Sequence, residues 1–208
     1  MQHKPLTSDV AKLSLLLACL ASLLILAGMP GCSERQTAEK FLATDISGMD
    51  VGGDFTLTDH NGKLRKLSEF KGKAVVLFFG YTHCPDVCPT TLSEMALALK
   101  QLGADAQRVQ ILFVTLDPER DTTAVLAQYV PSFNPAFLGL RGSAAETIAM
   151  TRKFKVFAQK HETGSSSGYT LDHSASSFVF DPAGKPRLLI GFGQGPEAVV
   201  HDLKLLLH

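Results

Sequence analysis

Two cysteines four residues apart, Cys84 and Cys88, are the residues of this sequence best suited to chemistry. They lie in Cys84-Pro-Asp-Val-Cys88, after an apolar run and at the start of a helical pattern. Residues at i and i+4 share one helix face, so both sulfurs could bind one metal ion or form a disulfide when oxidised. The free N–H groups and partial positive charge at a helix N-terminus favour thiolate over thiol. The pair therefore predicts metal-binding or redox chemistry rather than two inert structural cysteines.

Two thiolates need a third partner to hold a metal, and His173 is the histidine that we expect to supply it. It lies in Leu171-Asp-His-Ser174, just before an apolar stretch at 177–180 that predicts a strand. His83 is next to Cys84, and we expect it to lower the pKa of the thiols rather than to bind metal. The remaining histidines are expected to be solvated: His3, His60, His161, His201 and His208.

The expected ligands indicate which metal the site would take. Two soft thiolates and one imidazole suit Cu(I), and they accept Cu(II) with a further ligand. Zinc usually takes four protein ligands, or three and a water. Asp117, at the end of a predicted strand, is a candidate additional or outer-sphere ligand; it could equally be the N-cap of the following helix. The sequence leaves both roles open, and Asp86 is expected to be a first-turn acid favoured by the helix dipole.

Hydrophobic patterns predict the elements that position these residues. Continuous apolar runs at 74–79 and 109–116 predict strands buried on both faces, and a helix at 86–102 lies between them. Asn61-Gly62 predicts a hairpin turn. The other predicted elements are hairpin strands at 55–58 and 63–67, helices at 122–129 (stopped by Pro131) and 144–153, an extended run at 155–159, a flexible loop at 164–168, hairpin strands at 177–180 and 187–190, and a last helix at 196–207.

This order predicts an α/β domain with a mixed central sheet, flanked by helices and carrying an N-terminal hairpin. A cysteine pair at the first strand-to-helix junction makes the arrangement thioredoxin-like. In that fold, the loop before the 177–180 strand faces the cysteine pair. Thioredoxins place a cis-proline there, whereas this sequence has no proline between 136 and 181 and has His173 nearby.

The N-terminal residues 1–32 form a separate segment. Lysines are followed by an apolar stretch, 13–27, which is typical of an export signal and short for a spanning helix of roughly 17–25 residues. Gly31-Cys32 resembles the end of a bacterial lipobox, so Cys32 is a candidate lipidation site; an uncleaved membrane anchor is the alternative. We expect residues 33–50 to be a tether and residues 51–208 to be the domain, facing the periplasm or the exterior.

Composition excludes some classes of function. The 208-residue chain has 20 basic and 20 acidic residues, without the basic footprint of a nucleic-acid-binding protein, so no nucleic-acid partner is expected. Of its four cysteines, two lie in the globular part, which excludes a disulfide framework as the source of stability.

Three motifs in order resemble the Sco/SenC family of copper-dependent cytochrome c oxidase assembly proteins. They are Phe79-Gly-Tyr-Thr-His-Cys-Pro-Asp-Val-Cys-Pro89, Leu116-Asp-Pro-Glu-Arg-Asp-Thr122 and Asp172-His173-Ser174. The resemblance runs from about residue 51 to the C-terminus. It implies copper ligation by Cys84, Cys88 and His173, and it implies that Asp117 is an acidic residue near the metal.

The resemblance also implies a function in the bacterial cell envelope. The chain would deliver copper to the binuclear site of oxidase subunit II, taking it from an upstream periplasmic copper donor and relying on a thioredoxin-like reductant. Alternatively, it would reduce the cysteines of that subunit. As a general thiol–disulfide oxidoreductase, it would use Cys84 as the nucleophile and Cys88 as the resolving cysteine. A peroxidase is the less favoured reading, since the chain contains no tryptophan.

Overall fold

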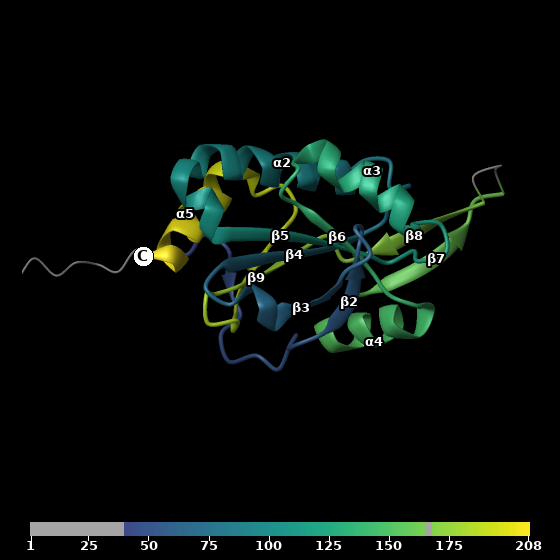
Figure 1. The fold of residues 1–208 in the computed structure, drawn as a ribbon, viewed down its shortest axis with the longest axis horizontal. Helices are drawn as coiled ribbons and strands as arrows, with labels where there is room; N and C mark the ends of the chain where they lie inside the picture. Colours follow the sequence, from purple (N-terminus) through teal and green to yellow (C-terminus); the bar gives the residue numbers. More distant parts are fainter. Residues whose placement is uncertain (1–39, 165–167) are drawn as a thin grey trace, which may run out of the picture. The chain divides into compact units, whose positions relative to one another are not determined.

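Three parallel strands form the centre of the sheet: β4 (Ala74–Gly80), β5 (Val109–Thr115) and β6 (Leu138–Arg141). They belong to a computed structural model that describes residues 40–164 and 168–208 (Figure 1). Every residue of β4 is buried, as the continuous apolar run predicted. Strand β4 and the helix after it, α2 (Val87–Leu102), are confirmed within a residue of their predicted bounds.

Antiparallel strands extend the sheet on both sides. On the β4 side lie β9 (Ser177–Phe180), β10 (Pro186–Ile190) and β1 (Thr44–Asp45); on the β6 side lie β2 (Thr56–Asp59) and β3 (Leu64–Lys66). Among the described residues the order is β1-β10-β9-β4-β5-β6-β2-β3. Both predicted hairpins, β2–β3 and β9–β10, are confirmed.

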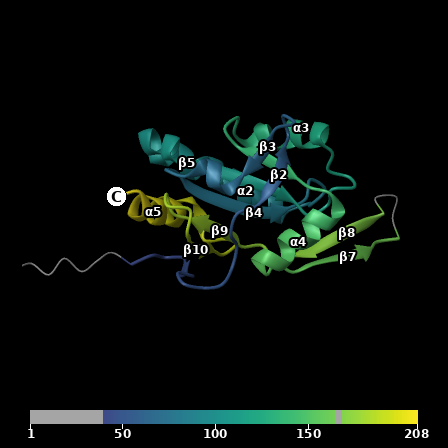
Figure 2. The same ribbon diagram turned by 60° about the horizontal axis from the view of Figure 1, so that its bottom comes forward.

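Helices cover both faces of the sheet (Figures 1 and 2). Helices α2, α3 (Thr123–Phe133) and α5 (Gly195–Leu207) pack on one face, and α4 (Ala144–Phe154) packs on the other. Side chains of β4 alternate between the two cores: Val76 and Phe78 face α2, whereas Leu77 and Phe79 face the α4 side. Two short 3-10 helices, Leu67–Phe70 and Gly103–Arg108, complete the described elements. The predicted mixed sheet with flanking helices is confirmed.

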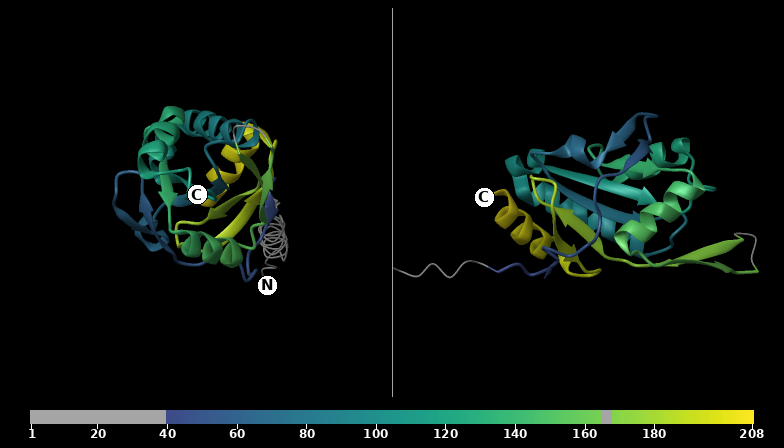
Figure 3. Two further views of the ribbon diagram at one scale, coloured as in Figure 1. Left: turned by 90° about the vertical axis from the view of Figure 1, so that its right-hand side faces the viewer. Right: turned by 90° about the horizontal axis from the view of Figure 1, so that it is seen from below.

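A second sheet of two antiparallel strands, β7 (Ala158–Glu162) and β8 (Tyr169–His173), forms what we call the β7–β8 ribbon. It projects beyond the main sheet at the end opposite the C-terminus (Figures 1 and 3). The sequence predicted an extended run at 155–159 and a flexible loop at 164–168, but not this strand pair. Residues 165–167 of that loop lie outside the described residues.

Two further differences from the sequence prediction concern β6 and α3. Strand β6 was missed because it is only four residues long and contains a glycine, Gly139. The glycine allows close packing, since a Cβ added there would lie 2.9 Å from a methyl group of Val130. The prediction that Pro131 stops α3 is wrong, because the helix continues to Phe133. Pro131 lies in the last turn, where its missing N–H removes a single bond and little helix follows.

The fold begins before residue 51. Ala43 and Ile46 are buried, and β1 pairs with β10. The backbone N–H groups of Leu42 and Ala43 each donate to the buried carboxylate of Asp202, at 2.8 Å. Part of the expected tether therefore packs on the domain. Residues 1–39, with the expected signal segment and Cys32, lie outside the described residues, and within the described part no helix is both long and apolar enough to span a membrane.

Candidate metal centre

The two cysteines lie at the junction between β4 and α2. Cys88 is in the first turn of α2 and is fully buried, whereas Cys84 lies in the preceding loop and is partly exposed. Both are free thiols in the structure. The backbone N–H of Cys88 donates to the sulfur of Cys84, 3.4 Å away. The helix start therefore directs a hydrogen-bond donor at the exposed sulfur, as the sequence predicted.

The end of β4 makes room for the buried sulfur. Gly80 is the last residue of that strand, and a Cβ added there would lie 2.8 Å from Cys88 Sγ and 2.8 Å from a ring carbon of Phe113. Such distances are shorter than van der Waals contact, so a side chain at position 80 would displace the sulfur or the ring. The glycine is needed here for close approach.

His173 is the last residue of β8, and its imidazole faces the cysteines. Its Nε2 is 3.5 Å from Cys88 Sγ, and its Nδ1 is 2.9 Å from the backbone carbonyl of Ser174. A carbonyl oxygen can only accept a hydrogen bond, so Nδ1 carries the proton. In the neutral ring the lone pair is then on Nε2, the atom that points at the sulfur. This outer hydrogen bond fixes the tautomer that a metal requires.

The structure thus brings the three predicted ligands together. One ligand atom each from Cys84, Cys88 and His173 lies within 4.8 Å of the others. Three ligands held at about 2.3 Å around one ion would lie about 4 Å apart, so the present separations need only small adjustments to enclose it. In the part of the chain that the structure describes, no other group of His, Cys, Asp and Glu residues meets this criterion.

Burial favours the uncharged forms of Cys88 and His173. It raises the pKa of the Cys88 thiol far above its usual value, and it lowers the pKa of the His173 imidazole. The expectation that the helix start favours a thiolate is therefore wrong for Cys88 in the absence of a metal, because its sulfur is removed from water. A bound cation would supply the positive charge that a buried thiolate lacks.

The site opens to solvent on the Cys84 side. A cleft of about 390 Å³ is lined by the cysteine loop and by the ribbon strand β8. Tyr81 forms part of this wall, and its ring lies edge-on to the His173 ring with centroids 5.9 Å apart. The residues that line the cleft include Tyr81, Cys84, Pro85, Asp86, Leu171 and His173. An ion or a partner's side chain could reach the sulfurs from this side.

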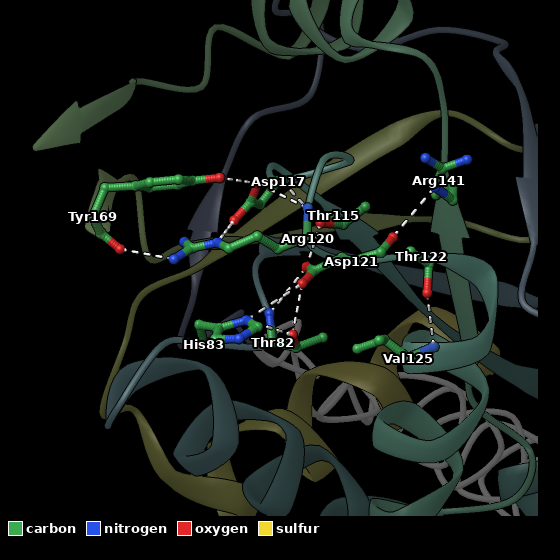
Figure 4. Close-up of polar contacts among 10 residues, drawn as sticks. All are labelled: Thr82, His83, Thr115, Asp117, Arg120, Asp121, Thr122, Val125, Arg141 and Tyr169. Atoms are coloured by element: carbon green, nitrogen blue, oxygen red, sulfur yellow. Dashed lines mark hydrogen bonds and ion pairs between the residues drawn. The ribbon is translucent and has the colours of Figure 1, made fainter. Parts of the chain in front are cut away.

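Asp117 does not belong to the group of possible ligands. It is buried, and its carboxylate accepts hydrogen bonds from the Tyr169 hydroxyl, at 2.8 Å, and from Arg120 Nε (Figure 4). Its role as an additional or outer-sphere group stays a prediction, whereas the alternative that it caps the following helix is wrong. The N-cap of α3 is Thr122, whose hydroxyl accepts from the N–H of Val125. Asp117 instead joins the end of β5 to the ribbon.

The remaining sequence expectations are met in part. His83 is exposed beside Thr82, with Nδ1 3.1 Å from the Thr82 hydroxyl, and it is not among the possible ligands. His60 is not simply solvated, because its Nδ1 accepts the backbone N–H of Gly139. Asp86 occupies the N-cap position of α2 rather than its first turn, and its side chain makes no capping bond.

The other described histidines pair with carboxylates. His161 lies 3.1 Å from Asp172 on the ribbon, and His201 lies 2.8 Å from Asp202 on α5. His208 lies 3.3 Å from Asp105. His3 lies outside the described residues.

Sequence reasoning missed Arg120 and Tyr169, which both contact Asp117. Arg120 stands in the motif that was singled out for Asp117, so its charge beside two acids was a signal that could have been used. Tyr169 follows the flexible loop and gave no comparable signal. The Asp117 hydrogen bond and burial raise the pKa of Tyr169 to about 12, with burial as the larger cause.

Solved structures similar to this chain include two bacterial proteins. The copper-bound ScoI of Bradyrhizobium japonicum is 42% identical with a TM-score of 0.70, covering 76% of this chain and 99% of that one. The apo Sco1 of Thermus thermophilus is 40% identical with a TM-score of 0.72, covering 82% and 99%. These similarities confirm the predicted thioredoxin-like fold.

Related sequences agree. The bovine mitochondrial SCO2 homolog is 42% identical over 134 residues, covering 64% of this chain and 50% of the relative, so the chain spans about half of that protein's length. A SCO2-like protein of Rickettsia felis is 36% identical over 174 residues, covering 81% and 85%. The SCO1/SenC family model matches residues 43–208. The chain belongs to the SCO1/SenC family.

Proposed function

We propose that this protein is a copper metallochaperone. It binds copper through Cys84, Cys88 and His173 and helps to build the binuclear copper site of cytochrome c oxidase subunit II. The observation that carries the proposal is the arrangement of the ligand atoms. They lie within 4.8 Å of one another. Because Nδ1–H donates to the Ser174 carbonyl, Nε2 of the neutral ring carries the lone pair that can bind a metal. Copper is here the cargo of the protein.

The donor set favours copper over zinc. Two thiolates and one imidazole satisfy Cu(I), which accepts low coordination numbers, whereas structural zinc sites use four protein ligands. Within the described residues, no fourth His, Cys, Asp or Glu joins the group. Two relatives, from Bradyrhizobium japonicum and Arabidopsis thaliana, were solved with copper bound, and they are 42% and 32% identical to this chain.

A thiol–disulfide reductase explains the site less well. Such an enzyme needs an accessible nucleophilic sulfur and a resolving sulfur, and Cys84 and Cys88 could fill these roles. It has no need for an imidazole held by its Nδ1–H with Nε2 facing Cys88 at 3.5 Å. The position of His173 therefore favours metal binding.

The chemistry of the site also indicates its partners. A disulfide between Cys84 and Cys88 would offer no thiolate, so a thioredoxin-like reductant must keep the pair reduced, and an upstream periplasmic donor must supply the copper. Oxidase subunit II is the acceptor. Membership of the family supports these assignments, and with them we propose that the domain works in the bacterial cell envelope.

The N-terminal segment would hold the protein at the membrane. Residues 1–32 act as the signal or anchor, Cys32 is the proposed lipidation site, and the residues between this segment and β1 serve as the tether. Cys32→Ser should leave an unprocessed precursor of higher mass in the membrane fraction, as mass spectrometry of the purified chains would show. Equal mature masses for variant and wild type would instead support an uncleaved helix.

The test of copper binding is a competition titration of the full chain. We expect one tightly bound Cu(I) per reduced chain and no tight binding once Cys84 and Cys88 form a disulfide.

His173→Ala should abolish the Cu(II)–thiolate charge-transfer band, because the third ligand is lost. His161→Ala is the matched control, since His161 lies on the same ribbon with its side chain about half exposed. Equal affinity for the reduced and oxidised chains would refute the proposal.

A further inference from the structure

The loop from Asp117 to Thr122, which joins β5 to α3, contacts Thr82, two residues before Cys84, and Tyr169, in the strand that ends in His173 (Figure 4). We propose that this loop is a clamp that fixes the position of His173 relative to the cysteines, with Arg120 as the positioning residue on the His173 side. The inference rests on the proposed copper site and assigns a role to residues that do not bind the metal.

Arg120 holds the first residue of the strand that ends in His173. Its Nη1 donates to the backbone carbonyl of Tyr169 at 2.9 Å, and its guanidinium lies 3.6 Å from the centroid of the Tyr169 ring. Its Nε donates to Asp117, which also accepts the Tyr169 hydroxyl at 2.8 Å. Backbone, ring and hydroxyl of Tyr169 are thus all held by the loop.

The ribbon needs such an attachment because it is not part of the main sheet. Strands β7 and β8 pair with each other, and neither belongs to the eight-stranded sheet that carries the cysteine junction. Tyr169 and His173 are four positions apart along the extended strand, or about 13 Å. Movement of Tyr169 would therefore be transmitted along β8 to the imidazole.

The other end of the loop holds the cysteine side. The carboxylate of Asp121 is fully buried, and it accepts the Thr82 backbone N–H at 3.0 Å and the Thr82 hydroxyl at 2.6 Å. It also accepts the Thr115 hydroxyl at 2.5 Å. Thr82 lies two residues before Cys84, so the loop that carries the exposed sulfur is tied to the same segment.

The clamp is itself fixed to the sheet. Arg141, at the end of β6, donates from Nη2 to the carbonyl of Pro118 at 2.8 Å. Its Nε donates to the carbonyl of Asp121 at 3.2 Å (Figure 4). The N–H of Asp121 donates to the carbonyl of Asp117 at 2.9 Å. The loop is therefore a rigid reference from which both His173 and the cysteine loop are positioned.

Arg120→Gln in the full chain tests the clamp. It removes the charge and the stacked guanidinium, and we expect Cu(II) affinity to fall by about tenfold or more, as for other residues that orient metal ligands. In a His173→Ala background the same change should cause no further loss, because the imidazole that Arg120 positions is absent. Equal losses in both backgrounds would overturn the proposal, because Arg120 would then act independently of His173.

A second measurement does not depend on copper. In the metal-free chain, Arg120→Gln should accelerate amide hydrogen exchange in β8, whereas Lys160→Gln should not. Lys160 is the matched control: its ammonium lies 3.6 Å from the same Tyr169 ring, but from the ribbon itself. Unchanged exchange in β8 of Arg120→Gln would also overturn the clamp. If the wild type binds no copper, the proposed function fails. The hydrogen-exchange measurement in β8 would still show whether Arg120 holds the ribbon in place.

Tyr169→Phe covers the case in which Arg120→Gln does not fold. It deletes the hydroxyl bond to Asp117 and keeps the ring under the guanidinium. We expect a smaller loss of Cu(II) affinity, which is again absent when His173 is alanine. Wild-type Cu(II) affinity and wild-type exchange in β8 of this variant would count against the clamp.

Discussion

Cys84 and Cys88 are four residues apart and differ sharply in their surroundings. Cys88 has no exposed surface and its burial raises the pKa of its thiol, whereas Cys84 lines the open cleft. Since thiolate and not thiol is the nucleophile, the burial of Cys88 and its raised pKa both make this sulfur the less reactive of the two. The outer sulfur is the one that a reagent entering the cleft meets first.

Alkylation of the reduced, metal-free chain tests this difference. Iodoacetamide near neutral pH should modify Cys84 more than about tenfold faster than Cys88, because Cys88 reacts only when the fold opens locally. Peptide mass spectrometry would follow the two sites separately. In concentrated urea the rates should become similar, which serves as the control. Equal rates in the native protein would contradict the assigned burial.

The sequence predicted which residues meet at this site but not how the neighbouring residues are used. Cys84, Cys88 and His173 were selected by residue type and by position relative to strands. The role of Asp117 depends on Tyr169, which lies far away along the chain, so local sequence could not separate a ligand from a cap. The hydrogen bond from a backbone N–H of β6 to His60 could not be predicted either, because its two partners are far apart in the sequence.

At the scale of elements, the junction of β4 and α2 shows how a strand end shapes the metal centre. Gly80 ends the strand, and the space that a side chain would fill is taken by Cys88 Sγ and by Phe113. The Cys88 sulfur and the Phe113 ring cannot both move to admit a side chain, because both residues are fully buried in the core.

Gly80→Ala should therefore harm both stability and copper binding. Overpacking of this kind costs about 1–3 kcal/mol, which urea unfolding would measure, and displacement of the sulfur should weaken Cu(I) affinity. Gly191→Ala is the matched control, because a Cβ there meets no atom within 4 Å and Gly191 has no positive φ. If the two variants have the same stability and affinity, the close approach at Gly80 is unimportant.

Elements with a strong hydrophobic pattern were predicted, and elements without one were missed. Strands β4 and β5 are continuous apolar runs, and α2 repeats its apolar residues on one face. Every residue of β7 is exposed, so no buried face left a pattern in the sequence. Its pairing with β8 is set by backbone hydrogen bonds across the loop and by the Arg120 contacts at Tyr169.

At the scale of the whole molecule, the first described residues complete the domain. Asp202 on α5 has 1% of its surface exposed and accepts two backbone N–H groups, from Leu42 and Ala43. If a buried carboxylate loses these donors, its desolvation penalty remains and no hydrogen bond offsets it. The segment before residue 51 is thus required by α5 as well as by β10.

A chain that begins at residue 51 should be less stable than one that begins at residue 40. Each hydrogen bond to a charged group contributes about 1.5–3 kcal/mol, so we expect a loss of about 3 kcal/mol or more in urea unfolding. Asp202→Asn provides the control, because it should cost the longer chain more than the shorter one. Equal stability of the two chains would show that residues 40–50 do not support the fold.

The burial of Cys88 links copper transfer to proton transfer. In the metal-free protein this sulfur holds a proton, since its pKa is raised, and copper can bind only after that proton has left. Loading therefore releases the proton to the surroundings, and delivery takes one back. Copper binding at this site should therefore weaken as the pH falls, because protons compete with the metal for the buried sulfur.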